Sequence, residues 1–138
     1  MPQQSEALTP LAKAYRFLIV DDSLFARKNL ARLVEGIGGV VIGEAANGRE
    51  ALERYFELRP DMVLMDVSMP EMGGLEALGM IREKDASAKV VIVSSLGYED
   101  IVKKAIALGA AHYIPKPFKT RSAADIIKFV LEKESPQK

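Results

Sequence analysis

The sequence lacks cysteine altogether, so disulfide bonds and thiolate metal sites are excluded. It also lacks a net charge, because 19 lysine and arginine residues balance 19 aspartate and glutamate residues. This balance predicts neither direct nucleic-acid binding nor attraction to a membrane surface. No hydrophobic run approaches a membrane span, and residues 1–14 contain no apolar core of signal-peptide length. We therefore expect a cytoplasmic protein.

The hydrophobic content is sufficient for one globular domain. Hydrophobic residues make up 49% of the 138 residues, and a chain of this size buries roughly two-thirds of its unfolded surface. Residues 1–14 contain glutamines, Ser5 and Pro10 and predict a flexible N-terminal leader. We expect the domain to span residues 15–134 and to be followed by a short tail at 135–138.

Short β-branched runs alternate along the chain with longer segments of helical periodicity. Strands are predicted at residues 15–21, 40–46, 62–66, 90–94 and 112–114. Helices are predicted after an Asp22-Ser23 cap and at residues 50–58, 75–84, 99–108 and 123–133.

The strand pattern predicts the architecture of the sheet. The run at 62–65 is apolar throughout, which is typical of a strand covered by helices on both faces. Strands that alternate with helices require right-handed crossovers and a parallel sheet. We predict an α/β fold of the flavodoxin-like type, with a doubly wound five-stranded sheet in the order 2-1-3-4-5 and five helices. Pro115 places the last strand at an edge.

Polar groups stand at the ends of the predicted strands. Asp21 and Asp22 follow the first strand, Asp66 ends the third, Ser94 ends the fourth and Lys116 follows the fifth. The carboxyl ends of parallel strands line one crevice, so these groups should converge. Three carboxylates about 4 Å apart repel by roughly 4 kcal/mol per pair at an effective dielectric constant of about 20, and therefore need a cation or a raised pKa. Carboxylates favour Mg²⁺, and an aspartate beside Mg²⁺, a lysine and a hydroxyl suits phosphoryl transfer to the carboxylate.

These residues lie in motifs that resemble the receiver domain of two-component response regulators. Any one motif is weak evidence, but five of them occur in order. They are Val20-Asp21-Asp22-Ser23, Ala46-Asn47-Gly48, Met65-Asp66-Val67-Ser68-Met69-Pro70, Val93-Ser94, and Gly109-Ala110 leading to Tyr113-Ile114-Pro115-Lys116-Pro117-Phe118.

The resemblance implies a chemical role for each of these groups. Asp66 would accept a phosphoryl group from a histidine kinase or a phosphotransfer protein, with Lys116 and Ser94 as the other reacting-site residues. The Mg²⁺ ligands would be Asp21, Asp22, Asp66 and the backbone carbonyl of Ser68. The protein would promote its own phosphorylation and dephosphorylation, and would not be an enzyme with a separate substrate.

The resemblance also implies a conformational switch. Ser94 and Tyr113 would move together after phosphorylation, and the Lys116–Pro117 peptide bond would be cis. The segment 93–97 is similar to that of the chemotaxis CheY-like group. The chain would then carry phosphate to a downstream protein such as the flagellar motor switch, which must bind one of two states more tightly.

Some residues allow a second interpretation from the sequence. Asp22 taken alone fits a helix cap. Arg27, Lys28 and Arg32 on the first helix form either a solvated face or part of a docking surface for a partner. His112 is expected to lie at the surface or to pack at the sheet edge.

Two other functions stay open at this stage. One is a receiver cut from a larger regulator, or a shuttle in a phosphorelay, where the chemistry is the same and the partners differ. The other is a Mg²⁺-dependent phosphatase of the haloacid-dehalogenase kind. That family requires Asp-x-Asp after its first strand, and this pattern is missing here.

Overall fold

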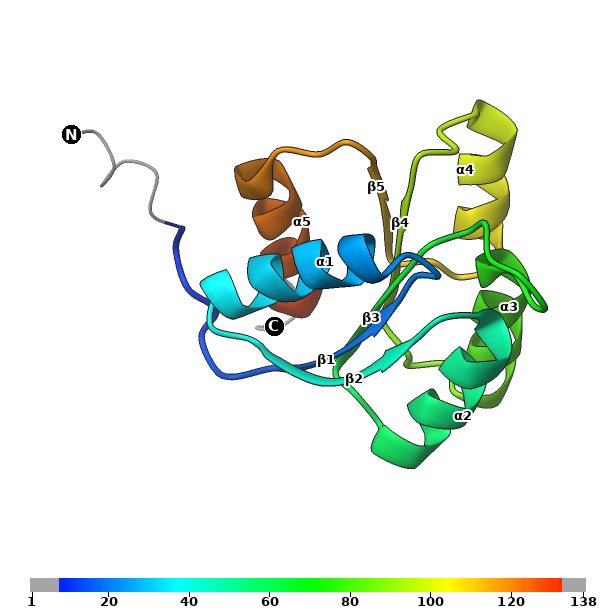
Figure 1. Ribbon diagram of the computed structural model, residues 1–138, viewed down its shortest axis with the longest axis horizontal. Coiled ribbons are helices and arrows are strands. Elements are labelled where there is room, and N and C mark those ends of the chain that lie inside the picture. The colour runs from blue at the N-terminus through cyan, green and yellow to red at the C-terminus, as the bar shows by residue number, and fades with distance from the viewer. Residues whose placement is uncertain (1–7, 133–138) are drawn as a thin grey trace.

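The computed structural model describes residues 8–132 and contains one parallel sheet in the order β2-β1-β3-β4-β5 (Figure 1). The strands are β1 (Arg16–Val20), β2 (Val40–Ala45), β3 (Met62–Met65), β4 (Val90–Ser94) and β5 (His112–Pro115). The helices are α1 (Leu24–Gly36), α2 (Gly48–Leu58), α3 (Gly74–Lys84), α4 (Glu99–Ala107) and α5 (Thr120–Glu132). The predicted flavodoxin-like topology is confirmed.

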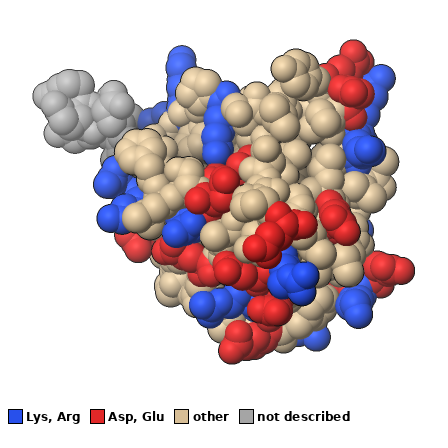
Figure 2. Space-filling view, turned by 45° about the vertical axis from the view of Figure 1, so that its right-hand side comes forward, with Lys and Arg blue, Asp and Glu red and all other residues tan. Residues whose placement is uncertain are grey.

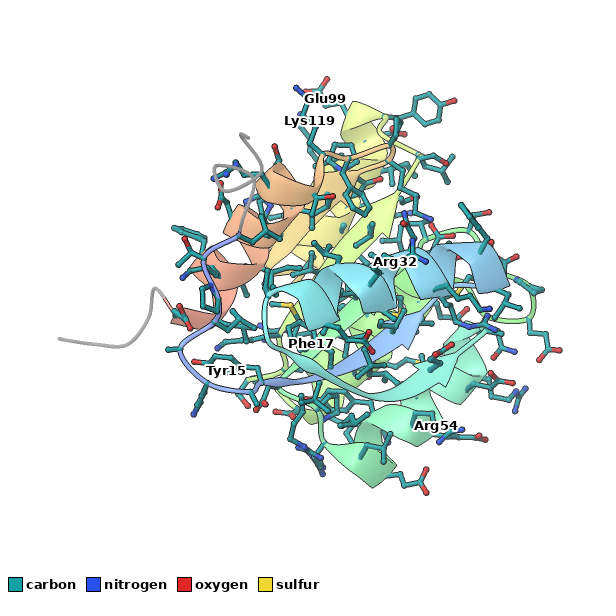
Figure 3. All side chains as sticks on the ribbon, turned by 60° about the vertical axis from the view of Figure 1, so that its left-hand side comes forward. Tyr15, Phe17, Arg32, Arg54, Glu99 and Lys119 are labelled. Carbon is teal, nitrogen blue, oxygen red and sulfur yellow. The ribbon has the colours of Figure 1, made fainter. Side chains whose placement is uncertain are left out.

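Helices cover both faces of the sheet, as the apolar strands predicted. Helices α1 and α5 lie on one face, and α2, α3 and α4 lie on the other (Figure 1). Along β1, Phe17 and Ile19 pack toward α1 and α5, and Phe17 lies under α1 (Figure 3). Leu18 and Val20 pack against the opposite helix layer. Among the described helices, none has both the length and the apolar composition that crossing a bilayer requires.

The boundaries of β1, β3 and α1 bear on the site. Strands β1 and β3 each end one residue before the predicted boundary, so Asp21 and Asp66 lie in the loops that follow them. Helix α1 begins at Leu24, and its N-cap is Ser23, whose Oγ accepts a hydrogen bond from the Ala26 N–H at 3.1 Å. The capping interpretation of Asp22 is therefore wrong. Helix α5 begins at residue 120, whereas the predicted start was residue 123. The prediction missed the first turn because that turn is polar and shows no apolar periodicity.

The structure differs from the predicted flexible leader over residues 8–14. Leu11 is 7% exposed and belongs to the core between α1 and α5. Its N–H donates to the Ile37 carbonyl at 2.8 Å, and the Ala12 N–H donates to Glu132 Oε2 at 2.7 Å. Two leucines, Leu8 and Leu11, separated by threonine and proline are too few to establish a periodicity, so the sequence pattern did not indicate this packing. Residues 1–7 and the predicted tail at 135–138 lie outside the described residues.

Candidate functional site

Three carboxylates meet where β1 and β3 end. Asp21, Asp22 and Asp66 each present an oxygen, and these three atoms lie within 4.8 Å of one another. They converge because β1 and β3 are neighbours in register, with Val20 beside Met65. Asp21 is 1% exposed, Asp66 is half-buried and Asp22 is exposed. Hard oxygen donors in this number suit Mg²⁺, which prefers carboxylates completed by water and substrate phosphate.

Asp21 is held at both carboxylate oxygens. Its Oδ1 accepts a hydrogen bond from the Ser23 N–H at 3.0 Å, and its Oδ2 accepts one from Lys116 Nζ at 2.7 Å. The Lys116 ion pair is well shielded, since the Asp21 side chain is 2% exposed and that of Lys116 is 25% exposed. A buried carboxylate requires such pairing. The lysine thus brings its positive charge to the cluster through Asp21.

Asp66 is partly desolvated within this cluster. Its Oδ1 accepts a hydrogen bond from the Val67 N–H at 2.8 Å. Burial raises the pKa of Asp66 above its ordinary value and the negative charge of Asp21 adds to this, while the positive charge of Lys116 opposes it. The neutral form is therefore favoured more than in a solvated aspartate, and a cation at the cluster would restore the ionised form.

Ser94 and Tyr113 are linked through the backbone of Leu96. The Leu96 N–H donates to Ser94 Oγ at 3.1 Å, and the Tyr113 hydroxyl donates to the Leu96 carbonyl. Ser94 is 1% exposed and Tyr113 is 8% exposed, so both residues are largely buried. Burial raises the pKa of Tyr113, which keeps its hydroxyl a proton donor. The loop after β4 therefore connects the cluster to β5.

Gly74 allows α3 to start directly against the loop that carries Asp66. A Cβ atom at this position would lie 1.9 Å from the Asp66 backbone oxygen, a distance that no side chain tolerates. The Gly74 N–H donates to the Val67 carbonyl at 2.8 Å. The Gly73-Gly74 pair signals a loop in the sequence, but the close approach to Asp66 is visible only in the structure.

Comparison with known proteins decides the family. The sequence-family model of the response regulator receiver domain matches residues 17–128 of this chain.

The chain belongs to the response regulator receiver family.

The curated relatives of this receiver include chemotaxis proteins. Chemotaxis protein CheY of Thermotoga maritima is 44% identical over 115 residues, which cover 83% of this chain and 96% of that protein. CheY of Listeria monocytogenes is 45% identical over 118 residues, which cover 86% of this chain and 96% of that protein. The receiver is thus a CheY homologue, a signalling protein and not an enzyme with a separate substrate. The hypothesis of a haloacid-dehalogenase-like phosphatase is wrong.

A solved relative contains the ligands expected at such a site. The crystal structure of the CheX–CheY–BeF3–Mg²⁺ complex from Borrelia burgdorferi matches this receiver with a TM-score of 0.83 and 35% identity. The match covers 86% of this chain and 90% of that chain. The presence of Mg²⁺ in that complex agrees with the acidic cluster of this receiver.

The receiver brings most of the predicted site residues together. Asp21, Asp22 and Asp66 form the cluster, and Lys116 contacts it at Asp21. The Lys116–Pro117 peptide bond is cis. Ser68 lies exposed in the loop after β3, and the ligand role of its carbonyl stays a prediction.

His112 has a local structural role, in agreement with the expected edge packing. Its Nδ1 accepts a hydrogen bond from the Tyr113 N–H at 2.9 Å, and its ring is nearly perpendicular to that of Phe129, with centroids 6.5 Å apart. His112 therefore orders the start of β5 at the edge of the sheet.

Sequence reasoning missed two residues of the receiver site. Leu96 links Ser94 to Tyr113 through its backbone, and a backbone link leaves no trace in residue type. Arg27 donates to the Asp21 carbonyl at 2.7 Å and to Glu44 Oε1 at 2.8 Å, so it is not part of a solvated face. Nothing in the sequence distinguishes Arg27 from the exposed Lys28 and Arg32 on the same helix.

Proposed function

We propose that this receiver accepts a phosphoryl group on Asp66 from a histidine kinase or a phosphotransfer protein and acts in chemotaxis signalling. The observation that carries the proposal is the convergence of three carboxylate oxygens within 4.8 Å, with Lys116 against one of them. Asp66 is the acceptor because it is the member of the cluster without the strong pairing that holds Asp21, and it is less exposed than Asp22.

The residues of the cluster fit a magnesium site. Asp21, Asp22 and Asp66 would hold Mg²⁺ together with the backbone carbonyl of Ser68. Bound there, the ion would offset negative charge on the phosphoryl oxygens. Burial raises the pKa of Asp66 and the negative charge of Asp21 adds to this, so a cation at the cluster would favour the ionised form that the proposed attack requires.

Phosphoryl transfer would occur by direct attack of Asp66. An ionised oxygen of Asp66 attacks the phosphorus of a phosphohistidine, and a phosphorus–oxygen bond forms as the phosphorus–nitrogen bond breaks. The imidazole leaves with the electron pair of the broken bond. Lys116 supplies positive charge beside the transferred group, and the Ser94 hydroxyl donates a hydrogen bond to one of its oxygens.

The signal would pass to β5 through the loop after β4. When Ser94 turns toward the phosphoryl group, it gives up the hydrogen bond from the Leu96 N–H at 3.1 Å. The loop that holds the Tyr113 hydroxyl is then released, and Tyr113 changes its position. This is a shift between two populated states, so the partner must prefer one of them.

The responding surface is formed by α4, β5 and α5. Tyr98 and Ile106 on or beside α4 are 67% and 51% exposed, and Phe129 on α5 is 53% exposed. An exposed apolar surface of this kind suits a protein partner. We propose a downstream protein such as the flagellar motor switch as the target. Acidic side chains gather across the middle of the face drawn in Figure 2, with basic ones mainly around them, which does not favour nucleic acid as a partner on that side.

The cellular setting is part of the same proposal. A receiver of this kind must meet its phosphodonor and its target by diffusion, so we propose that it works in the cytoplasm.

A shuttle in a phosphorelay, or a receiver belonging to a larger regulator, would use the same site with other partners. Two measurements separate these functions: binding of the BeF3-activated protein to a motor-switch peptide, and phosphoryl transfer from the acetyl-phosphate-labelled protein to a phosphotransfer domain.

The central experiment is chemical phosphorylation. The protein is incubated with Mg²⁺ and acetyl phosphate, and mass spectrometry detects the added phosphoryl group. We expect modification of the wild type and of Asp125→Asn, which removes an exposed carboxylate on α5, and none of Asp66→Asn. Equal labelling of Asp66→Asn, or an unmodified wild type, would show that the acceptor is assigned wrongly.

A further inference from the structure

Arg27 ties three elements together beside the acidic cluster. It lies in the first turns of α1, but its side chain turns back toward the sheet and is 17% exposed. One terminal nitrogen donates to the backbone carbonyl of Asp21 at 2.7 Å, and Nε donates to Glu44 Oε1 at 2.8 Å. A single planar guanidinium thus joins α1, the end of β1 and the end of β2.

The carbonyl that Arg27 binds belongs to the peptide group between Asp21 and Asp22. A peptide group is planar, so fixing this oxygen fixes the orientation in which the Asp22 backbone begins. The other polar atoms of Asp21 are already held: its N–H donates to the Ala45 carbonyl at 3.0 Å, and both carboxylate oxygens accept hydrogen bonds. Arg27 completes this set of contacts.

We propose that Arg27 is a positioning residue for the acidic cluster. Arg27 fixes the Asp21–Asp22 peptide group and thereby presents both carboxylates to a divalent cation. The inference rests on the proposed function, because the cation considered is the Mg²⁺ of that site. Groups that orient metal ligands without touching the metal commonly control affinity in this way.

The alternative role of Arg27 is purely electrostatic and has the opposite sign. A positive charge near a cation site repels the cation, so removing that charge alone tightens binding. Removing a positioning contact weakens binding. The direction of the change in Mg²⁺ affinity therefore distinguishes the two roles.

The main test is a Mg²⁺ titration of the unphosphorylated protein, followed by amide chemical shifts in NMR spectra. We expect Arg27→Ala to bind Mg²⁺ about 10-fold more weakly than the wild type. Arg32→Ala is the matched control, because Arg32 is an exposed arginine of the same helix (Figure 3), and it should leave the affinity unchanged. Unchanged or tighter binding by Arg27→Ala overturns the proposal.

Two further variants distinguish the loss of a positioning contact from misfolding of Arg27→Ala. Arg27→Lys keeps the charge, but one ammonium group cannot reproduce the planar fork, so its affinity should stay below that of the wild type. Glu44→Gln keeps an acceptor for Nε and should remain within about twofold of the wild type. Full affinity in Arg27→Lys, or a loss in Glu44→Gln as large as in Arg27→Ala, contradicts positioning through the Asp21 carbonyl.

A second readout follows phosphorylation by acetyl phosphate as a function of Mg²⁺ concentration. Arg27→Ala should need about 10-fold more Mg²⁺ for its half-maximal rate, and should approach the wild-type rate at saturation. The two proposals fail in different ways. If the wild type is never phosphorylated, the proposed function fails, and the NMR titration still tests the role of Arg27.

Discussion

Replacing Asp66 by asparagine should stabilise the fold when Mg²⁺ is absent. The substitution keeps the shape of the side chain and an oxygen that can accept the Val67 N–H, now 2.8 Å from Asp66 Oδ1. It removes one negative charge from a cluster of three. A residue that is proposed to be essential for function therefore weakens the folded state, and the structure allows the size of this effect to be worked out.

The repulsion follows from the distances in the cluster. For oxygens within 4.8 Å, Asp66 and the buried Asp21 repel by about 3.5 kcal/mol at an effective dielectric constant of about 20. Asp22 is exposed, so water screens its repulsion with Asp66 to about 1 kcal/mol. Lys116 cancels much of this, but the raised pKa of Asp66 shows that burial and repulsion outweigh it. We expect Asp66→Asn to raise the free energy of unfolding by about 1–2 kcal/mol at neutral pH.

The dependence on pH and on Mg²⁺ gives the effect a specific signature. Because the folded-state pKa of Asp66 is raised, the wild type loses stability as pH rises from the ordinary aspartate value through the folded-state pKa. The advantage of Asp66→Asn should therefore be absent in acid and complete at neutral pH. At ten times its dissociation constant, Mg²⁺ stabilises the wild type by about 1.4 kcal/mol and closes most of the gap.

Urea unfolding at several pH values, with and without Mg²⁺, measures these differences. Asp125→Asn serves as the control, because it removes an exposed charge outside the cluster and should change stability by less than about 0.5 kcal/mol. An Asp66→Asn variant that is less stable than the wild type at neutral pH without Mg²⁺, or whose advantage is the same in acid, would contradict a destabilising charge at Asp66.

Three further substitutions test other parts of the structure. Leu11→Ala should lower the free energy of unfolding by about 2–3 kcal/mol, since Leu11 is buried in the core; a change near zero in urea unfolding would place it outside the core. Gly74→Ala should lower the free energy of unfolding by about 2 kcal/mol or more and slow acetyl-phosphate labelling, because its Cβ would lie 1.9 Å from the Asp66 carbonyl oxygen. A wild-type labelling rate and melting temperature would disprove the close packing. Lys116→Met leaves the buried Asp21 carboxylate without its cation and should lower stability by about 1–3 kcal/mol in urea at neutral pH, whereas a more stable variant would refute this role of the ion pair.

Local patterns predicted much of the fold. The apolar run of β3 before Asp66, and the alternation of such runs with helical periodicity, were sufficient to predict a parallel sheet with helices on both faces. The helix after β1 was expected at the right place because Ser23 is a strong capping residue. The start of α5 was missed because its polar first turn has no apolar periodicity to mark it.

The exact pairing of groups could not be predicted, since it depends on distances between segments far apart in the chain. The sequence predicted that Lys116 joins the cluster, but not that it pairs with Asp21, 95 positions away. Outside the site, the contact of the Ala12 N–H with Glu132 spans 120 positions. The Ser94 to Tyr113 link passes through a backbone group, which residue types do not reveal.

The sequence by itself determined which chemical groups follow which strands, because short local patterns of residues specify strand ends and turns. Tertiary structure alone decided how those groups are paired. Arg27 and Arg32 are the same residue on the same helix, yet one clamps the Asp21 carbonyl and the other is exposed. The difference is physical: a side chain five positions along a helix points in another direction, and only the packing of α1 on the sheet determines which direction faces the acidic cluster.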